Sequence, residues 1–498
     1  MIRKSEMASY SFSIFFLAMS LVPLLLLCLY DHPSTLDDFL VFTQIKNGHN
    51  FFADFRLGNR YTTVFWPMLI HFAPKVTIES IAKALAVYRV YAFFFIVFFS
   101  FSVYYLVNKI NKHILNLSNS SFSLLFSVTM FYLINSAHYL SFFFYDIILT
   151  SGYTLGLSLL LVLIALLVGY YKEGKHKALM LTVSIIMSGT IEFYCVILIL
   201  ACFTFLIWKY YKVRKIDFYM VLLLGLNVVI MFSYLYAPWV SAKISTYAPG
   251  VADPHSLARF IGWIKGTLAY YGNSIGNAVH YNTLPVIVLI ASLAYFGANR
   301  RLKMPLLLVV ALLSIPALIS FSLFYSGVEN INDKYSAVMI MNVFVGMAFI
   351  SLLIYIIAKC EMAYRRFVEK YQVSEPINTI SVSISKEMGT VGKRLAILTM
   401  IVYAGCITIA LPGLSTRTAW KDLLKGTAAR YDRDVSAVYS QLLDSSDETA
   451  MLTEIRDQPA TLIVDDLWTN RKFTDYPMDI DSQIGPFFGK SNIVILPR

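Results

Sequence analysis

Long apolar runs, repeated along most of the chain, constrain its fold more than any other feature. Each run is roughly 17 to 25 residues long, which matches a hydrocarbon core about 30 Å thick. The stretch from Tyr153 to Tyr171 is apolar on every face of a helix, whereas the strands of a transmembrane β-barrel alternate apolar and polar residues. The sequence therefore predicts an all-α polytopic membrane protein and excludes a β-barrel.

Composition and charge exclude two further classes of protein. Of the 498 residues, 58% are hydrophobic and 14% are charged, whereas soluble domains carry roughly 25% charged residues. The net charge is +11. Most of the basic residues that produce it lie in short clusters between apolar runs, which the positive-inside rule places in the cytoplasm. We therefore expect neither a soluble enzyme nor a nucleic-acid partner. The five cysteines have no paired spacing that would indicate a disulfide framework or a zinc site.

Basic clusters between the apolar runs determine the predicted topology. They lie near residues 3–4, 109–112, 172–177, 209–215, 300–303 and 359–394. If every cluster is cytoplasmic, an even number of crossings separates each neighbouring pair. This condition gives about eleven transmembrane helices with the N-terminus in the cytoplasm and the C-terminus outside. They are expected near residues 11–30, 81–107, 122–141, 153–171, 178–191, 193–208, 217–237, 284–298, 304–324, 335–358 and 395–411.

The interval 178–208 is the most informative part of this topology. Basic clusters flank it on both sides, so the chain must leave the cytoplasm and return within it. Two short helices that meet at Gly189-Thr190-Ile191-Glu192 satisfy this condition and place Glu192 at or just below the outer surface. The alternative, one long helix, breaks the positive-inside rule.

The predicted topology divides the chain into two domains. Residues 1–411 form a transmembrane domain with outer loops at 31–80, 238–283 and 325–334, and residues 412–498 form an external domain. The tail is rich in charged residues, and it contains an amphipathic stretch, 432–443, and short apolar runs at 460–464 and 492–496. These patterns predict a small α/β domain.

The second outer loop contains an expected interfacial helix from His255 to Tyr271. Its apolar residues recur at helical spacing opposite Arg259 and Lys265.

The first outer loop holds the strongest candidates for chemistry. Asp37 and Asp38 follow the first helix directly. Adjacent carboxylates can act as a general base and its electrostatic partner, or can hold a divalent cation. Acidic residues in the first turn of a helix capped by Ser34 or Thr35 are an equally good interpretation. Downstream, Arg60 presents a planar guanidinium suited to phosphate, although an arginine at this depth can also reach lipid headgroups.

Ionisable residues inside apolar segments are further candidates. Glu192, Lys83 and Arg89 fall in predicted helices, where a charge is costly and usually functional. Glu329, Asp333 and Lys334 form a charged group in the third outer loop, for which a solvated loop is the simpler interpretation. The sequence contains no P-loop, dinucleotide-binding glycine fingerprint, metal-spaced histidine pair or Gly-x-Ser-x-Gly turn.

With these motifs in place, the chain resembles the GT-C superfamily of polytopic glycosyltransferases, and within it the bacterial and phage-associated serotype-converting O-antigen glycosyltransferases. Asp37-Asp38-Phe39 matches their paired acidic motif in the first outer loop. Gly58-Asn59-Arg60 is similar to their downstream Gly-x-Arg turn, and Glu192 resembles a second acidic position. Lys334 stands where related sequences often offer an arginine. A lysine binds phosphate as a point charge without the bidentate geometry of arginine.

The resemblance implies an inverting transferase in the bacterial inner membrane. Its donor would be a polyprenyl-phosphate sugar and its acceptor a saccharide or lipid-linked glycan on the periplasmic face. Asp37 or Asp38 would serve as the base, and Glu192 would be a second acidic residue of the catalytic site. The donor phosphate would lie near Arg60, with Lys334, Arg259 and Lys265 as further cations. The resemblance does not firmly imply a cofactor. In an alternative form of the reaction, the carboxylates would hold a divalent Mg²⁺ or Mn²⁺ ion.

Three other functions stay open at this point. An O-antigen polymerase also has many helices and would depend on arginines in two large outer loops. A lipid or polysaccharide flippase would need a charged path through the bundle. A receptor or assembly factor would act through the external tail.

Overall fold

The computed structural model describes residues 4–33, 39, 43, 47, 81–137, 140–146, 150–235, 260–271, 310, 314–321, 340–345, 414–463, 467–468 and 484–496. Most of these residues are helical. Four described helical segments are long and apolar enough to cross a membrane: Tyr10–Tyr30, Leu85–His113, Thr150–Glu173 and Glu192–Tyr211. Two shorter apolar helices, Lys177–Ser188 and Phe218–Tyr234, accompany them.

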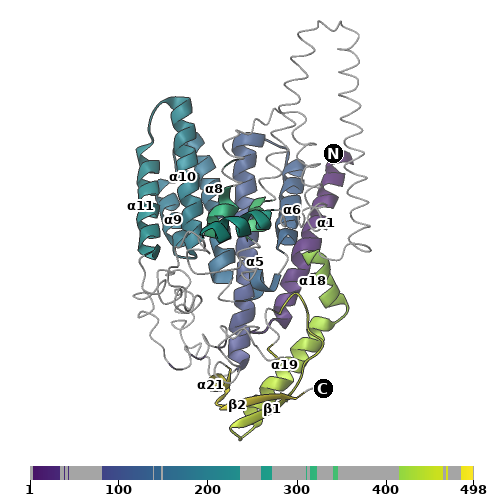
Figure 1. The fold of residues 1–498 in the computed structure, drawn as a ribbon. Helices are drawn as coiled ribbons and strands as arrows, with labels where there is room; N and C mark the ends of the chain where they lie inside the picture. Colours follow the sequence, from purple (N-terminus) through teal and green to yellow (C-terminus); the bar gives the residue numbers. More distant parts are fainter. Residues whose placement is uncertain are drawn as a thin grey trace.

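Among the described residues, seven α-helices run side by side in a bundle, which Figure 1 shows in side view. They are α1 (Lys4–Leu27), α5 (Ile81–Ile110), α6 (Asn119–Ser136), α8 (Leu155–Glu173), α9 (Lys177–Ser188), α10 (Glu192–Val213) and α11 (Phe218–Leu235). Each of the seven N-terminal segments predicted to be helical contains one of these helices, and four of the seven are long and apolar enough to cross a membrane. Of the remaining four predicted helices, 284–298 and 395–411 lie outside the described residues, and the other two contain the short helical pieces 314–321 and 340–345.

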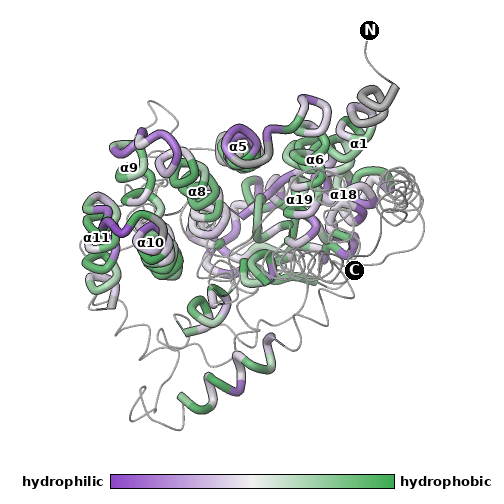
Figure 2. The backbone as a smooth tube through the Cα atoms, turned by 90° about the horizontal axis from the view of Figure 1, so that it is seen from above, coloured by the Kyte–Doolittle hydropathy of each residue, from purple (hydrophilic) through white to green (hydrophobic). Residues whose placement is uncertain are grey.

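Apolar side chains cover the outward faces of the bundle as well as its interior. Figure 2 shows hydrophobic residues along most of α8, α10 and α11. Large apolar side chains remain exposed on α5 and α11, including Phe93, Val97, Phe101, Val229 and Phe232. A helix that is apolar all round is suited to a membrane or to a large core.

One predicted helix boundary is wrong. The helix expected over 122–141 ends at Ser136, because Ala137 leaves the α region with φ −84° and ψ 89°. Two π-helical turns follow, η3 (Ser141–Tyr145) and η4 (Thr150–Thr154), before α8 begins. Both turns are largely buried, and two of their hydroxyls bond inside the protein: the Thr154 hydroxyl donates to the Phe143 carbonyl and the Tyr145 hydroxyl to the Leu24 carbonyl. Irregular backbone within a bundle requires such internal partners.

The predicted break between two short helices is confirmed. The chain turns at Gly189 and Thr190, whose amides donate to the last carbonyls of α9, and Ile191 is extended with φ −136° and ψ 145°. Asn227 of α11 ties the turn to its neighbour by accepting hydrogen bonds from the Ser188 hydroxyl (2.7 Å) and the Ser184 hydroxyl (3.3 Å). Polar side chains at these positions therefore hold α9 against α11.

The expected helix in the second outer loop is described over 260–271, and its orientation is informative. Its polar and aromatic side contacts the protein: Thr267 bonds Ser320 at 2.7 Å and Tyr270 bonds Asn342 at 2.8 Å. Its apolar side is exposed, as is Lys265; the exposed apolar residues are Phe260, Ile261, Ile264 and Leu268. This orientation suits a helix at a lipid surface.

The C-terminal segment, residues 414–496, contains α18 (Ser415–Leu424), α19 (Thr427–Asp444), β1 (Thr449–Thr453), α21 (Gly485–Phe488) and β2 (Asn492–Leu496). The strands pair in parallel, with Thr449 opposite Asn492 and Thr453 opposite Leu496. The amphipathic stretch 432–443 lies in α19 and the run 492–496 is β2, as the sequence predicts. The run 460–464 does not form a strand in its described part, which is a turn. The strand that pairs with β2 is β1.

The C-terminal segment contacts α1 at a carbonyl that a proline leaves without its usual donor. Pro23 lies inside the helix and has no amide hydrogen, so the carbonyl of Met19, four residues earlier, loses its usual donor. The indole Nε1 of Trp420 in α18 donates to that carbonyl at 3.2 Å. Two further bonds join α18 to the end of α6: the Ser415 hydroxyl donates to the Ala137 carbonyl (2.5 Å) and the Thr416 hydroxyl to Asn135 Oδ1 (2.9 Å).

Candidate functional site

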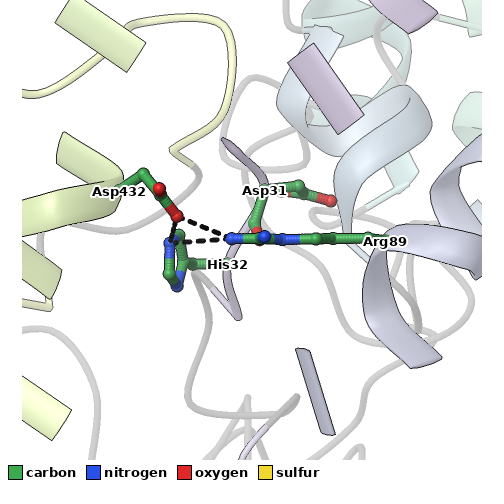
Figure 3. Close-up of polar contacts among 4 residues, drawn as sticks. All are labelled: Asp31, His32, Arg89 and Asp432. Carbon is green, nitrogen blue, oxygen red and sulfur yellow. Dashed lines mark hydrogen bonds and ion pairs between the residues drawn. The ribbon is translucent and has the colours of Figure 1, made fainter. Parts of the chain in front are cut away.

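The strongest polar cluster in the described structure lies where α19 meets the ends of α1 and α5. It consists of Asp31, His32, Arg89 and Asp432, shown in Figure 3. These residues come from three parts of the chain, and Asp432 is 400 positions from His32. Four charged or titratable groups in one place make this the main candidate for function.

The end of α1 presents the first two residues. The 3-10 turn η1 (Cys28–Tyr30) closes the helix, and Asp31 follows in an extended conformation with φ −75° and ψ 139°. Pro33 comes next, and a proline disfavours the helical conformation for the residue before it. Local sequence thus directs the chain out of the helix, which brings the Asp31 carbonyl and the His32 ring to the end of the bundle.

Arg89 of α5 joins these groups. Its Nε donates to the Asp31 carbonyl oxygen at 3.1 Å, and its Nη2 donates to Asp432 Oδ1 at 2.6 Å. The side chains of Arg89 and Asp432 are each 30% exposed. An ion pair with two directed hydrogen bonds is stronger than a neutral contact, so Arg89 links α1, α5 and α19.

His32 completes the cluster as a neutral, oriented imidazole. Its Nε2 lies 2.8 Å from Asp432 Oδ1, and its side chain is fully buried between Tyr431 and Tyr439, at ring distances of 5.9 and 5.7 Å. Since a carboxylate only accepts, Nε2 carries the hydrogen and Nδ1 keeps its lone pair. Nδ1 has no hydrogen-bond partner in the described structure.

The pKa values of the pair agree with this assignment. Burial lowers the pKa of His32, and the positive charge of Arg89 adds to this effect, while the bond to Asp432 opposes it. The hydrogen bond from His32 lowers the pKa of Asp432, as does the charge of Arg89, although burial opposes the change. At neutral pH the cluster therefore holds a carboxylate, a guanidinium and an uncharged imidazole.

An aromatic pocket lies beside this cluster. Phe39 is fully buried, and its ring packs against four rings of the C-terminal segment at centroid distances of 6.2 to 6.4 Å; these belong to Tyr439, Trp468, Phe487 and Phe488. Phe39 is the residue after the predicted acidic pair in the sequence. Phe39 therefore belongs to the same core as the C-terminal segment.

The structure describes only two of the seven residues in the predicted site, Glu192 and Lys265. Asp37, Asp38, Arg60, Arg259 and Lys334 lie outside the described residues. Glu192 begins α10 and is 9% exposed, where its charge is favourable at a helix N-terminus. It is not among the residues that contact His32, Arg89 or Asp432 in the described structure. Lys265 is exposed on the helix 260–271.

Among the described residues, no group of three or more His, Cys, Asp or Glu side chains is arranged to hold a metal ion. The alternative of a divalent cation on Asp37 and Asp38 lies outside that part of the chain.

Part of the cluster can be predicted from the sequence. Arg89 was a candidate because a charge in an apolar helix needs a partner, and Asp31 and His32 lie in the segment that carries the acidic pair. Asp432 had no assigned role, since nothing in its local sequence indicates a partner hundreds of residues away. Asp146, 1% exposed at the end of η3, was also missed; a single acidic residue in a short predicted loop carries little signal.

No family model matches the chain, and neither curated proteins nor solved structures give a match.

Proposed function

We propose that this chain is an inverting glycosyltransferase of the bacterial inner membrane. It would transfer a sugar from a polyprenyl-phosphate donor to a saccharide or lipid-linked acceptor on the periplasmic face. The observation that carries this proposal is the cluster of Asp31, His32, Arg89 and Asp432 at one end of an apolar helical bundle, in which the His32 side chain is fully buried. Asp37 and Asp38 follow five and six residues after His32 in the sequence.

The proposed topology has about eleven crossings, with the N-terminus in the cytoplasm. Two observations support it. The turn between α9 and α10 provides the return that the flanking basic clusters require. In addition, Asp432 contacts the residues directly after α1, so the C-terminal segment lies at the same end as the first outer loop, which an odd number of crossings requires.

The proposed reaction is a single displacement. Asp37 or Asp38 accepts the proton of the acceptor hydroxyl while its oxygen forms a bond to the anomeric carbon. The bond from that carbon to the phosphate oxygen breaks, and the configuration inverts. Arg60, Lys334, Arg259 or Lys265 would stabilise the charge on the leaving phosphate, as a divalent cation held by the carboxylates would in the alternative form. Glu192 is the proposed second acidic residue.

Transfer of labelled sugar by the purified, full-length protein tests this proposal. The donors are synthetic polyprenyl-phosphate sugars, and the variant is the Asp37→Asn/Asp38→Asn double substitution. Since a general base contributes about 100- to 10,000-fold, we expect at least a 100-fold loss. Asp444→Asn, an exposed acidic position on α19, is the control and should keep full activity.

Two results would contradict the proposal. Undiminished transfer by the double variant would place the base elsewhere. A folded wild-type protein that uses none of the donors would favour the O-antigen polymerase or the flippase.

A further inference from the structure

Basic residues that are distant in the sequence meet where α5 and α8 end. Lys112, in the π-helical turn η2 (Asn111–Leu115), places its Nζ 3.3 Å from Glu173 Oε1, 61 positions away. His113 Nε2 lies 3.5 Å from the same oxygen. Gly169 of α8 has no side chain, and a Cβ added there would lie 3.6 Å from Lys109 Nζ. The basic end of α5 therefore lies against the basic end of α8.

Two further lysines extend this group. Lys172 is close enough for its charge to act on His113, and the charge of Lys175 acts on Glu173 in the same way. We call the four lysine side chains the lysine cluster: Lys109, Lys112, Lys172 and Lys175. Three of them are exposed, and Lys109 is half-buried. Four lysines around one carboxylate keep an excess of positive charge, which attracts anions.

Aromatic rings connect the lysine cluster to the apolar surface of the bundle. Lys109 Nζ lies 5.6 Å from the centre of the Tyr105 ring, and this ring stacks on Phe101 with centroids 6.1 Å apart. Phe101 is 55% exposed. Residues four positions apart are neighbours on a helix surface, so Phe101, Tyr105 and Lys109 form one stripe along α5. The stripe leads from apolar surface to positive charge, which is the order of acyl chain and headgroup in an anionic phospholipid.

The lysine cluster and the candidate site lie at opposite ends of α5. Arg89 and Lys109 are both in this helix, and about 20 residues separate them by about 30 Å, the thickness of a hydrocarbon core. Figure 1 shows α5 running along the bundle, with the C-terminal segment at its other end. Beside the lysine cluster, Tyr171 packs on Trp208 of α10 with centroids 4.4 Å apart. Tyrosine and tryptophan are enriched at membrane interfaces, so this end fits the headgroup level of one leaflet.

We propose that the lysine cluster binds the headgroup of an anionic phospholipid, with an acyl chain along Phe101. The lysine ammonium groups donate charge-assisted hydrogen bonds to the headgroup phosphate, and basic pockets between membrane helices bind such headgroups. A soluble phosphate would use the lysines alone, whereas the stripe on α5 fits a molecule with an apolar chain. The inference requires that the bundle lies in a membrane, and it is independent of sugar transfer.

Native mass spectrometry of the full-length protein in a non-ionic detergent tests this inference. The probes are phosphatidylglycerol, which is anionic, phosphatidylcholine, which has no net charge, and inorganic phosphate as a soluble competitor. Lys109→Gln/Lys112→Gln removes two charges of the lysine cluster. Lys177→Gln/Lys215→Gln removes two exposed charges at the same end of the bundle, at the start of α9 and between α10 and α11, and it is the matched control.

We expect the wild-type protein to bind phosphatidylglycerol at least about 10-fold more tightly than phosphatidylcholine. Each lysine near an anionic surface contributes about 5-fold, so Lys109→Gln/Lys112→Gln should weaken the binding of phosphatidylglycerol about 25-fold. The control variant should weaken it by no more than about 2-fold, since its lysines lie outside the lysine cluster. Inorganic phosphate should not displace the bound lipid.

A substitution of the opposite sign strengthens the test. Glu173→Gln removes the carboxylate that Lys112 contacts and leaves this lysine to the headgroup. We expect about 2- to 5-fold tighter binding of phosphatidylglycerol. A gain in affinity cannot come from a misfolded protein.

Four results would overturn the inference. Equal affinity for the two lipids would show that the headgroup charge is not recognised. Equal losses in the two double variants would assign binding to the overall charge of this end. Displacement by inorganic phosphate would make a soluble anion the ligand, and unchanged or weaker binding by Glu173→Gln would separate the lipid from the lysine cluster. If Lys109→Gln/Lys112→Gln does not fold, Glu173→Gln and the single variant Lys172→Gln decide by the same criteria.

Discussion

His32 makes the docking of the C-terminal segment sensitive to pH. Its pKa in the folded protein is below the ordinary value of 6.5 because the ring is buried next to Arg89. As the pH falls through 6.5, the unfolded chain takes up a proton that the folded protein resists. The stabilisation is therefore complete above pH 6.5 and is lost as the pH falls towards the lower, folded-state pKa.

The measurement is the thermal unfolding midpoint in detergent between pH 7.5 and 5.5. We expect a steeper fall for the wild type than for His32→Gln, which removes the titrating ring. Asp432 does not confuse the result, because its lowered pKa moves its own effect below its ordinary value of 3.8. Equal slopes for the two proteins would rule out His32 as the source.

We expect Asp432 to contribute more to the free energy of unfolding than an exposed acidic residue on the same helix does. Asp432→Ala removes the acceptor of both Arg89 Nη2 and His32 Nε2. Partly buried donors without an acceptor cost about 1–3 kcal/mol, and chemical unfolding measures this loss. Asp444→Ala, on the same helix but exposed, should change the free energy of unfolding by less than about 0.5 kcal/mol. Similar losses for both variants would mean that the cluster adds nothing specific.

At the scale of elements, a glycine sets the distance between α8 and α10. A Cβ at Gly156 would lie 2.2 Å from the Tyr194 ring, whose hydroxyl donates to the Tyr153 carbonyl. Gly156→Ala must therefore displace a buried ring and should destabilise the protein by about 1–3 kcal/mol. Gly225→Ala is the matched control, because nothing lies within 4 Å of its added Cβ. Thermal unfolding that ranks the two variants equally would contradict this packing.

Whether the Trp420 indole compensates for the amide hydrogen that Pro23 lacks can be tested by a double-mutant cycle. Trp420→Phe leaves the Met19 carbonyl without its donor and should cost about 1–3 kcal/mol. Pro23→Ala supplies an amide hydrogen to the same carbonyl, so Trp420→Phe should cost about 1 kcal/mol less in that background. Unfolding in denaturant gives both values, and an additive cycle would show that the indole bond does not compensate for the proline.

At the scale of the whole molecule, the proposed topology places α19 outside and the α8–α9 turn inside. A cysteine at Ser440, exposed on α19, should react with a membrane-impermeant maleimide in intact cells. A cysteine at Lys175, exposed between α8 and α9, should react only after permeabilisation. The three described native cysteines are buried and give a low background. The reverse labelling pattern would invert the topology.

Helices and their breaks follow from the sequence because their causes are local. Apolar runs and basic flanks predict α1, α5 and α8 through α11, and the Gly189-Thr190 pair predicts the turn. The π-helical turns after α6 were not predicted, since the hydrogen bonds that stabilise them come from other elements, such as the Leu24 carbonyl of α1. Local propensity carries no information about such partners.

The sequence by itself determined that the chain forms apolar helices, where several of them end, and that Arg89 needs a partner. Only the tertiary structure decided that this partner is Asp432, that Trp420 serves the carbonyl freed by Pro23, and that Phe39 completes the core of the C-terminal segment. The physical reason is range. Helix formation depends on residues within a few positions, whereas a salt bridge or a buried ring gains its energy from groups that only folding brings together.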